Sequence, residues 1–281
     1  MSVILAALDT SSAARAVLET AVRIGQLTGA DVKAVHVHAG LLESDKTPVA
    51  LAERSGVPVE VLEDPVESSL IAAMAAPGVI AAVIGARATP SGRRPVGRTA
   101  RSILEQADKP VVVVAPEAVS PGAIRRLLVP LEGTEMSSQP VLERLMPLLV
   151  ADVELVVLHV FTDATMPVML DRPEYDMKIL GDEFLTRNCS LASQVELRTG
   201  PIATRVAEVS EEHRADLIVL SWSQDTSSER ARVVREVLGA SVLPVLLLPA
   251  KPLDINETVV GSSSPEGTRQ GPSRAKPRST G

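Results

Sequence analysis

The chain is poor in aromatic residues and in cysteine, and it has no long apolar run. Aromatic side chains make up 1% of its 281 residues, so its cores must consist of Val, Leu, Ile and Ala, which suits α/β layers. Its single cysteine, Cys189, excludes a disulfide within the chain and favours the cytoplasm. Apolar runs fall short of the roughly 18 to 20 residues that span a membrane, and the first stops at Asp9 without the basic flank of a signal peptide. We therefore expect a cytoplasmic protein with no membrane partner.

The charge and the missing motifs narrow the function. A net charge of −7 argues against nucleic acid as a partner. The sequence lacks the G-x-S-x-G, H-E-x-x-H and G-x-x-x-x-G-K-[ST] patterns. His36 and His38 alternate on one predicted strand, but no cysteine or carboxylate at ligand spacing supports a metal site. These absences favour a binding protein over an enzyme, with no catalytic residue and no metal-ligating set.

The chain contains an internal repeat. Residues 81–116 and 215–249 each begin with an apolar strand, continue through a polar loop and a helix, and end in an apolar strand that follows a proline. An offset of 134 superimposes the last helix and strand, and an offset of 136 the elements before them. Near the start the offset is 121, which places His159 on His38. Changing offsets are typical of a duplicated domain with loop insertions.

Strands alternate with helices in both copies. The predicted strands are 3–8, 31–38, 57–62, 79–84 and 110–115, then 127–131, 153–160, 191–197, 216–221 and 244–248. This order implies parallel βαβ crossovers and therefore a doubly wound sheet in each copy. We predict a first domain over residues 1–116, a linker over 117–123, a second domain over 124–250 and a disordered tail over 251–281.

These features resemble the universal stress protein family in its tandem, two-domain form. The resemblance covers about residues 2–116 and 124–249. It rests on the strand ending in Asp9-Thr10-Ser11, the helix that starts at Pro65, and the Gly85 loop with its following helix and valine-rich strand. It implies an α/β fold of two Rossmann-like (adenine nucleotide alpha hydrolase-like) domains, each a five-stranded parallel sheet of order 3-2-1-4-5. It also implies pairing of the domains through their last strands, or a homodimer.

Many members of this family bind ATP through a loop of the form G-x2-G-x9-G-[ST]. In the first copy Gly85 matches the first glycine, Ala88 replaces the second, and Gly97 matches the third after eight residues instead of nine. The resemblance therefore implies ATP, with magnesium, as the ligand. The implied nucleotide-binding residues are Asp9, Val37, Gly85, Ala88, Gly97, Arg98 and Thr99. Two simpler interpretations stay open: the loop is an exposed basic segment without a ligand, and Asp9 caps the helix that follows it.

The second copy departs further from the family pattern. Ser221, Gln224 and Ala231 stand near the three glycine positions, and Glu132 replaces the strand-end aspartate. We expect the Trp222 ring to fill the nucleotide cleft rather than to stack on a base, which makes this domain the poorer binder.

The whole pattern predicts a regulatory binding protein of the stress response that takes an adenine nucleotide in its first domain. A nucleotide-independent module for dimerisation and partner docking is one alternative. A weak nucleotide hydrolase is the other, although the sequence identifies no group to hold a metal-bound triphosphate or to position water.

Overall fold

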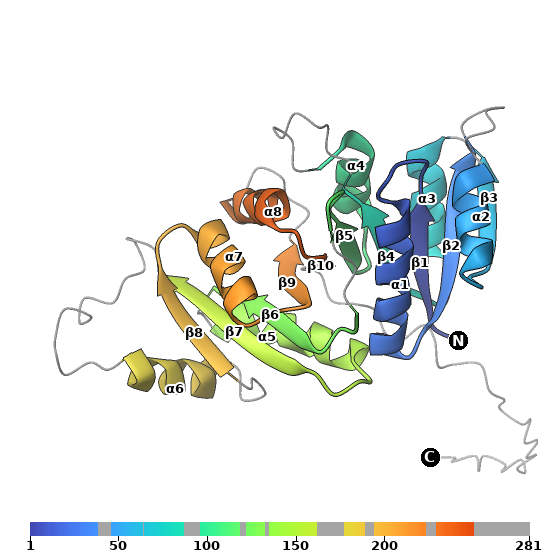
Figure 1. Ribbon diagram of the computed structural model, residues 1–281. Coiled ribbons are helices and arrows are strands. Elements are labelled where there is room, and N and C mark those ends of the chain that lie inside the picture. The colour runs from blue at the N-terminus through green and yellow to red at the C-terminus, as the bar shows by residue number, and fades with distance from the viewer. Residues whose placement is uncertain are drawn as a thin grey trace, which may run out of the picture.

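The computed structural model describes residues 1–38, 46–63, 65–86, 96–118, 122–132, 135–161, 177–188, 194–222 and 229–249. Ten strands form a single sheet with helices on both of its faces (Figure 1). The strands are β1 (Val3–Leu8), β2 (Asp31–His38), β3 (Val59–Glu63), β4 (Val79–Gly85), β5 (Val111–Val114), β6 (Arg126–Pro130), β7 (Glu154–Phe161), β8 (Gln194–Thr199), β9 (Leu217–Trp222) and β10 (Val245–Pro249). The helices are α1 (Ala14–Thr28), α2 (Lys46–Arg54), α3 (Val66–Ala75), α4 (Arg98–Gln106), α5 (Glu135–Leu145), α6 (Met177–Asn188), α7 (Ile202–Glu212) and α8 (Glu229–Ala240).

The strand order confirms the predicted fold class. Across the sheet the strands run β3-β2-β1-β4-β5 and then β10-β9-β6-β7-β8, so each half has the order 3-2-1-4-5. Neighbouring strands within each half are parallel, as right-handed βαβ crossovers require. The halves meet where β5 and β10 pair antiparallel, with Val112 opposite Leu246. This junction is called the seam. The domain limits at residues 116 and 124, and a homodimer, stay predictions.

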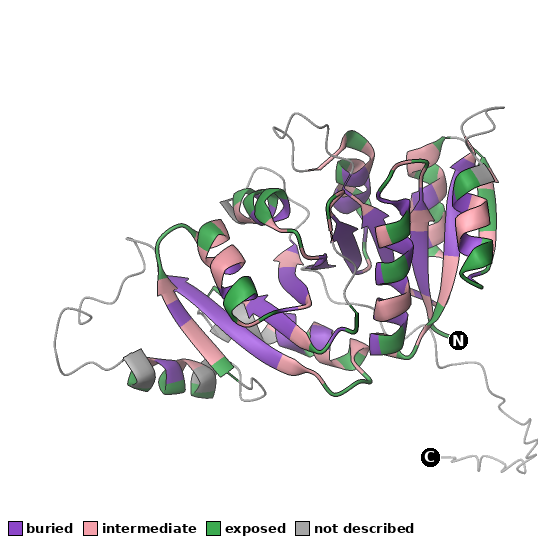
Figure 2. Ribbon diagram, in the orientation of Figure 1, coloured by how far each residue is buried: buried purple, intermediate pink, exposed green. Residues whose placement is uncertain are grey.

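Two apolar cores, one on each face of the sheet, run through both halves. Val111 and Val113 of β5 belong to one core and Val112 and Val114 to the other, because successive side chains of a strand point to opposite faces. The first core packs under α3, α4, α7 and α8, and the second under α1, α2 and α5. Figure 2 shows buried residues on the strands on both sides of the seam. The two halves therefore share their cores.

Proline and glycine set several helix limits, as the sequence predicts. Pro65 and Pro201 are the N-caps of α3 and α7 and have extended backbone. The missing proline N–H costs nothing there, because the first N–H groups of a helix have no intrahelical partner. Gly29 ends α1 in the left-handed conformation, with a φ of 66°, and its N–H donates to Gly25 O.

Strand register corrects one of the three repeat offsets. In the first half Ile4 pairs with Ala81 of β4, and in the second half Leu127 pairs with Leu217 of β9. Because the offset of 136 places Ala81 on Leu217, Ile4 corresponds to Leu127, and the first offset is 123 rather than 121. His159 therefore corresponds to His36, not to His38. The Ala-Asp-Val triplets at 30–32 and 151–153 suggested the wrong offset because they lie at different distances from the strands that follow. The first triplet reaches into β2, which begins at Asp31, whereas the second ends one residue before β7 begins at Glu154. In the second half a 3₁₀ turn (Met146–Leu148) ends the helix region, where the first half has the glycine cap.

Arg214 carries backbone strain that its repeat partner avoids. Among the described residues it is the one non-glycine with a positive φ, 51°, and the offset of 136 places it on Gly78, whose φ is 85°. A residue with a Cβ in the left-handed region costs about 1–2 kcal/mol of strain in the folded state. Glycine avoids this strain, but its more flexible unfolded chain offsets about 0.5–1 kcal/mol of the gain in stability. We expect Arg214→Gly to raise the free energy of unfolding by about 0.5–1 kcal/mol in urea denaturation. Arg214→Ala keeps the strain and should give no gain; an equal gain in both variants would show that the side chain, not the backbone, is responsible.

Candidate functional site

The candidate site of the first half lies where β1 and β4 end side by side. Ala6 pairs with Val83, so Leu8 and Gly85, each two residues further on, lie at the same edge of the sheet. From β1 the chain crosses to β2 on one side, and from β4 it crosses to β5 on the other. Such a reversal is the topological switch point at which open α/β sheets bind ligands. The structure therefore brings Asp9 and Gly85 to the edge that the sequence predicts.

Asp9 fixes the turn between β1 and α1. Its Oδ1 accepts hydrogen bonds from Ser11 N–H at 3.0 Å and from Ser11 Oγ–H at 2.5 Å. Ser11 Oγ in turn accepts a hydrogen bond from Ala13 N–H at 3.3 Å. Because α1 begins at Ala14 and its N-cap, Ala13, has no side-chain cap bond, the interpretation of Asp9 as the helix cap is wrong. Its carboxylate instead orders the turn that leads to the helix.

The start of α4 lies at the same edge and presents backbone N–H groups. Gly97 is the N-cap, with extended backbone and no side-chain cap bond, and Arg98 is the exposed first residue of the helix. Thr99 Oγ1 donates a hydrogen bond to Glu67 Oε1 of α3 at 3.0 Å. An open helix start attracts anions. Here a basic side chain adds to that attraction, whereas the Glu67 carboxylate opposes it.

The backbone conformation of two glycines of the predicted loop does not require glycine. Gly97 has a φ of −65°, and Gly85 is not among the residues with positive φ. A Cβ on Gly85 would lie 3.6 Å from Val17 Cγ2 and 3.9 Å from Ala13 Cβ, which are ordinary contacts. Backbone conformation therefore explains neither glycine, and crowding by the described residues does not explain Gly85. Close approach of a ligand to the backbone is an explanation that remains for the lack of a side chain at these positions.

The other predicted site residues differ in what they can offer. Val37 lies level with Asp9, since His36 pairs with Leu8, but its side chain is buried in the core beneath α3 and α4. It can present only backbone to a ligand. Ala88 lies outside the described residues, as does Gln224 of the second half.

Sequence reasoning missed two residues that shape this edge. Glu67 is one, and the Pro65 helix start was the signal that could have placed it there, because α3 and α4 both begin at the carboxyl ends of strands. His36 is the other. It is 4% exposed, and its Nδ1–H donates to Leu8 O at 2.8 Å. A strand histidine gives no sequence signal for such a bond.

His159 of the second half makes the corresponding bond. Its Nδ1–H donates to Leu131 O at 3.0 Å, and its ring lies 4.5 Å from Phe161 and 5.0 Å from Phe184 between centroids. Burial lowers the pKa of His159 from its ordinary value, and the bond to Leu131 O only partly offsets this effect. The ring is therefore neutral at pH 7. His159 is therefore a packed histidine of the core.

The second half has a buried alanine where the first half has the Gly97 helix start. Buried residues of α4 and α8 match at the offset of 134, for example Leu104 with Leu238. The same offset puts Gly97, the N-cap of α4, on Ala231, which is fully buried and is the third residue of α8. Relative to the repeat, α8 therefore begins three residues earlier than α4 does. This arrangement favours the prediction that the second half is the poorer binder.

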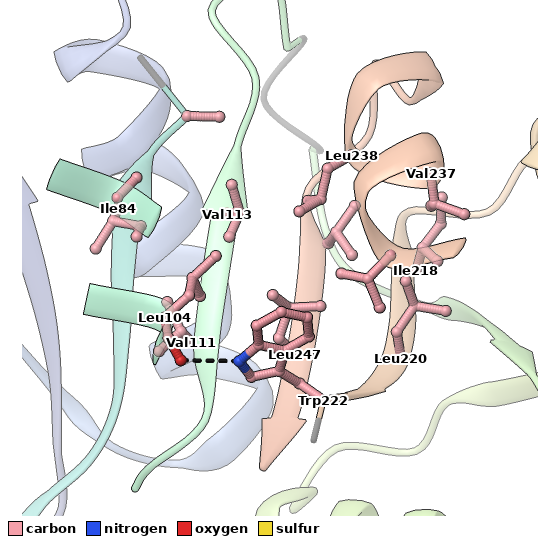
Figure 3. Packing of buried hydrophobic residues seen from close by; sticks show 14 of the residues in the cluster. Ile84, Leu104, Val111, Val113, Ile218, Leu220, Trp222, Val237, Leu238 and Leu247 are labelled. Atoms are coloured by element: carbon pink, nitrogen blue, oxygen red, sulfur yellow. Dashed lines mark hydrogen bonds between the residues drawn. The ribbon is translucent and has the colours of Figure 1, made fainter. Parts of the chain in front are cut away.

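Trp222 does not lie over a nucleotide cleft, and that prediction is corrected. The residue ends β9 and is 6% exposed, and its Nε1–H donates to Leu104 O of α4 at 2.8 Å, across the seam (Figure 3). Leu104 is among the last four residues of α4, whose carbonyls have no partner within the helix. The indole therefore caps a helix of the first half. The Trp222 ring therefore fills space at the seam and not in a ligand site.

Two kinds of feature are absent from the described residues. These residues contain no group of three or more His, Cys, Asp or Glu side chains that could hold a metal ion. They also contain no helix that is both long and apolar enough to cross a membrane.

Comparison with known proteins supports the family assignment. The sequence model of the universal stress protein family matches residues 123–249. A search of curated proteins found no match. Among solved structures, a protein of unknown function from Pseudomonas aeruginosa is similar at 14% identity and a TM-score of 0.62, covering 88% of this chain and 92% of its own. A universal stress protein from Archaeoglobus fulgidus is similar at 15% identity and a TM-score of 0.53, covering 88% of this chain and 96% of its own.

A universal stress protein in complex with cAMP also matches, at 18% identity and a TM-score of 0.33, over 46% of this chain and 100% of its own. The complex with cAMP is described for that protein and not for this chain. At 14% and 15% identity, the two longer matches establish a shared fold over both halves of the sheet. Residues 123–249 thus match the universal stress protein family, and the first half of the chain repeats the strand order of the second half.

Proposed function

We propose that the protein binds an adenine nucleotide, with ATP as the first candidate, at the carboxyl edge of β1 and β4. The observation that carries the proposal is the open start of α4 at Gly97, which lies at the same sheet edge as the Asp9 turn. Helix N–H groups and the exposed Arg98 supply donors and positive charge for phosphate. The Asp9 carboxylate is an acceptor for the hydroxyl groups of ribose. Binding of this kind would give the chain a regulatory role in the stress response.

A magnesium ion that accompanies the phosphates would be held by few protein groups. Magnesium usually takes one or two carboxylates together with substrate phosphates. Glu67 fits this requirement, since its hydrogen bond to Thr99 holds it at the first turn of α4. With the ion present, Glu67 would bind the metal and cease to repel the phosphates.

A nucleotide-independent docking module is the second candidate, and the bond between Thr99 and Glu67 favours it. The threonine hydroxyl that a phosphate would need is engaged, and a carboxylate stands beside the helix start. In this case the fold would serve only to present surfaces to a protein partner. The two candidates differ in one measurable property, the binding of nucleotide.

Titration calorimetry with ATP and magnesium, together with analysis of nucleotide released on denaturation, tests the proposal. We expect about one nucleotide per chain and a loss of binding in Gly97→Val, because a β-branched side chain would cover the helix start. Gly122→Val is the matched control. Gly122 does not have a positive φ, and a Cβ there meets nothing within 4 Å, so binding should be unchanged. Equal affinity in Gly97→Val would move the site elsewhere, and no binding by the unmodified protein would favour the docking module.

A further inference from the structure

Two buried histidines hold the ends of the central strands of the two halves. His36 and His159 are 4% and 6% exposed, and each donates through Nδ1–H to a carbonyl 28 residues earlier in the chain. The acceptors, Leu8 O and Leu131 O, correspond to each other in the repeat. They immediately precede Asp9 and Glu132, the two strand-end acids. In both halves, therefore, the residue that immediately precedes the strand-end carboxylate accepts the same histidine hydrogen bond.

The bond fixes more than the carbonyl that accepts it. A carbonyl oxygen cannot donate, so Nδ1 of each histidine must carry the proton. The oxygen of Leu8 also belongs to the planar peptide unit that contains the nitrogen and Cα of Asp9. Holding Leu8 O at 2.8 Å consequently fixes the plane from which the Asp9 side chain departs. On its other side, Asp9 is held by its bonds to Ser11.

We infer that His36 is a positioning residue for ligand binding at Asp9. It fixes the Leu8–Asp9 peptide and thereby directs the carboxylate toward the edge where the nucleotide would lie. This inference rests on the proposed function, and it adds a residue that does not itself touch the ligand. His159 performs the same structural task in the second half, where buried Ala231 replaces Gly97, and so provides a control within the same chain.

Three variants separate positioning from general stability. His36→Leu removes the donor, whereas His36→Asn keeps an N–H near the position of Nδ1. His159→Leu removes the corresponding bond in the second half and also the contacts with Phe161 and Phe184, so it should lose at least as much stability. Each variant is measured by its melting temperature and by its dissociation constant for ATP with magnesium. If His36→Leu does not fold, His36→Gln replaces it, because its amide lies one bond further out and misses the Nδ1 position.

We expect the dissociation constant to rise about tenfold in His36→Leu, the equivalent of one lost hydrogen bond. His36→Asn and His159→Leu should stay within about threefold of the unmodified protein, well under the 1.4 kcal/mol that a tenfold change represents. An unchanged constant in His36→Leu would overturn the inference. So would an equal rise in His159→Leu, because that result would trace the loss to stability alone.

Hydrogen exchange of the Ser11 amide separates this inference from the proposed function. That amide is protected by Asp9 Oδ1. If the unmodified protein binds no nucleotide, the proposed function fails, but the orienting role of His36 can still be measured. Exchange at Ser11 should be faster in His36→Leu and unchanged in His36→Asn and His159→Leu. Equal exchange in all three variants would remove His36 from any role at the Asp9 turn.

Discussion

Replacing Trp222 with alanine is expected to lower the free energy of unfolding by about 3–5 kcal/mol, the range for removing a buried aromatic ring. The residue packs in the core beneath α3, α4, α7 and α8, beside the strands that meet at the seam. Its loss would leave a cavity there and would also free Leu104 O at the end of α4. Chemical denaturation followed by circular dichroism measures the change. Because a typical domain is stable by only about 5–15 kcal/mol, a loss of this size is easily resolved.

Trp222→Phe separates the hydrogen bond from the ring. Phenylalanine keeps most of the apolar packing but cannot donate to Leu104 O, so we expect a loss of about 1–3 kcal/mol. A loss in Trp222→Phe as large as that in Trp222→Ala would place the whole effect in the hydrogen bond. A loss below about 1 kcal/mol in Trp222→Ala would show that the indole does not hold the halves together. As the chain has no other tryptophan, the tryptophan fluorescence of the unmodified protein, excited where tyrosine does not absorb, reports on the seam alone.

Val112→Asp should be still more damaging, with a loss of more than about 4 kcal/mol. Val112 is fully buried on β5, opposite Leu246 of β10, and it lies in the core beneath α1, α2 and α5. Among the described residues no lysine or arginine is buried, so none lies in that core to pair with a carboxylate. Sedimentation and denaturation measurements would detect separation of the halves, unfolding or aggregation.

Val61→Asp is the matched control for this experiment. Val61 is the same residue type in the same sheet, but it lies on the edge strand β3 and is 52% exposed. We expect a change of about 1 kcal/mol or less, because the new carboxylate stays in water. If both aspartate variants lost the same stability, the seam would be no more important than the outer edge of the sheet.

The sequence predicted the strands and their order better than it predicted which residues correspond in the two halves. Apolar runs such as Val111–Val114 mark buried parallel strands whatever surrounds them. The offset of 121, by contrast, relied on matching letters in a turn, where the chain tolerates shifts that a strand does not. Register between β6 and β9, compared with that between β1 and β4, decides the question, and register is a property of backbone pairing that single-sequence patterns do not contain.

The candidate site was predicted in part. The switch point follows from strand order, so Asp9 and Gly85 could be placed at one edge in advance. The partner of Thr99 lies 32 residues away, and the partner of Trp222 lies 118 residues away. Such contacts depend on how helices pack, and residue types alone do not reveal them. Trp222 was therefore assigned to the nearest plausible cleft, although its carbonyl partner belongs to the other half.

The covalent link between the halves permits an asymmetry that two identical subunits could not have. In a twofold dimer, every substitution at the junction appears twice, so both ends must accept the same side chain. Here the repeat places Trp222 on Ala86, and Leu104, which accepts the indole bond, on Leu238. One end of the junction carries a large ring and the other a single methyl group. Each end can therefore change independently, and the first half can keep a ligand site while the second adapts to hold it in place.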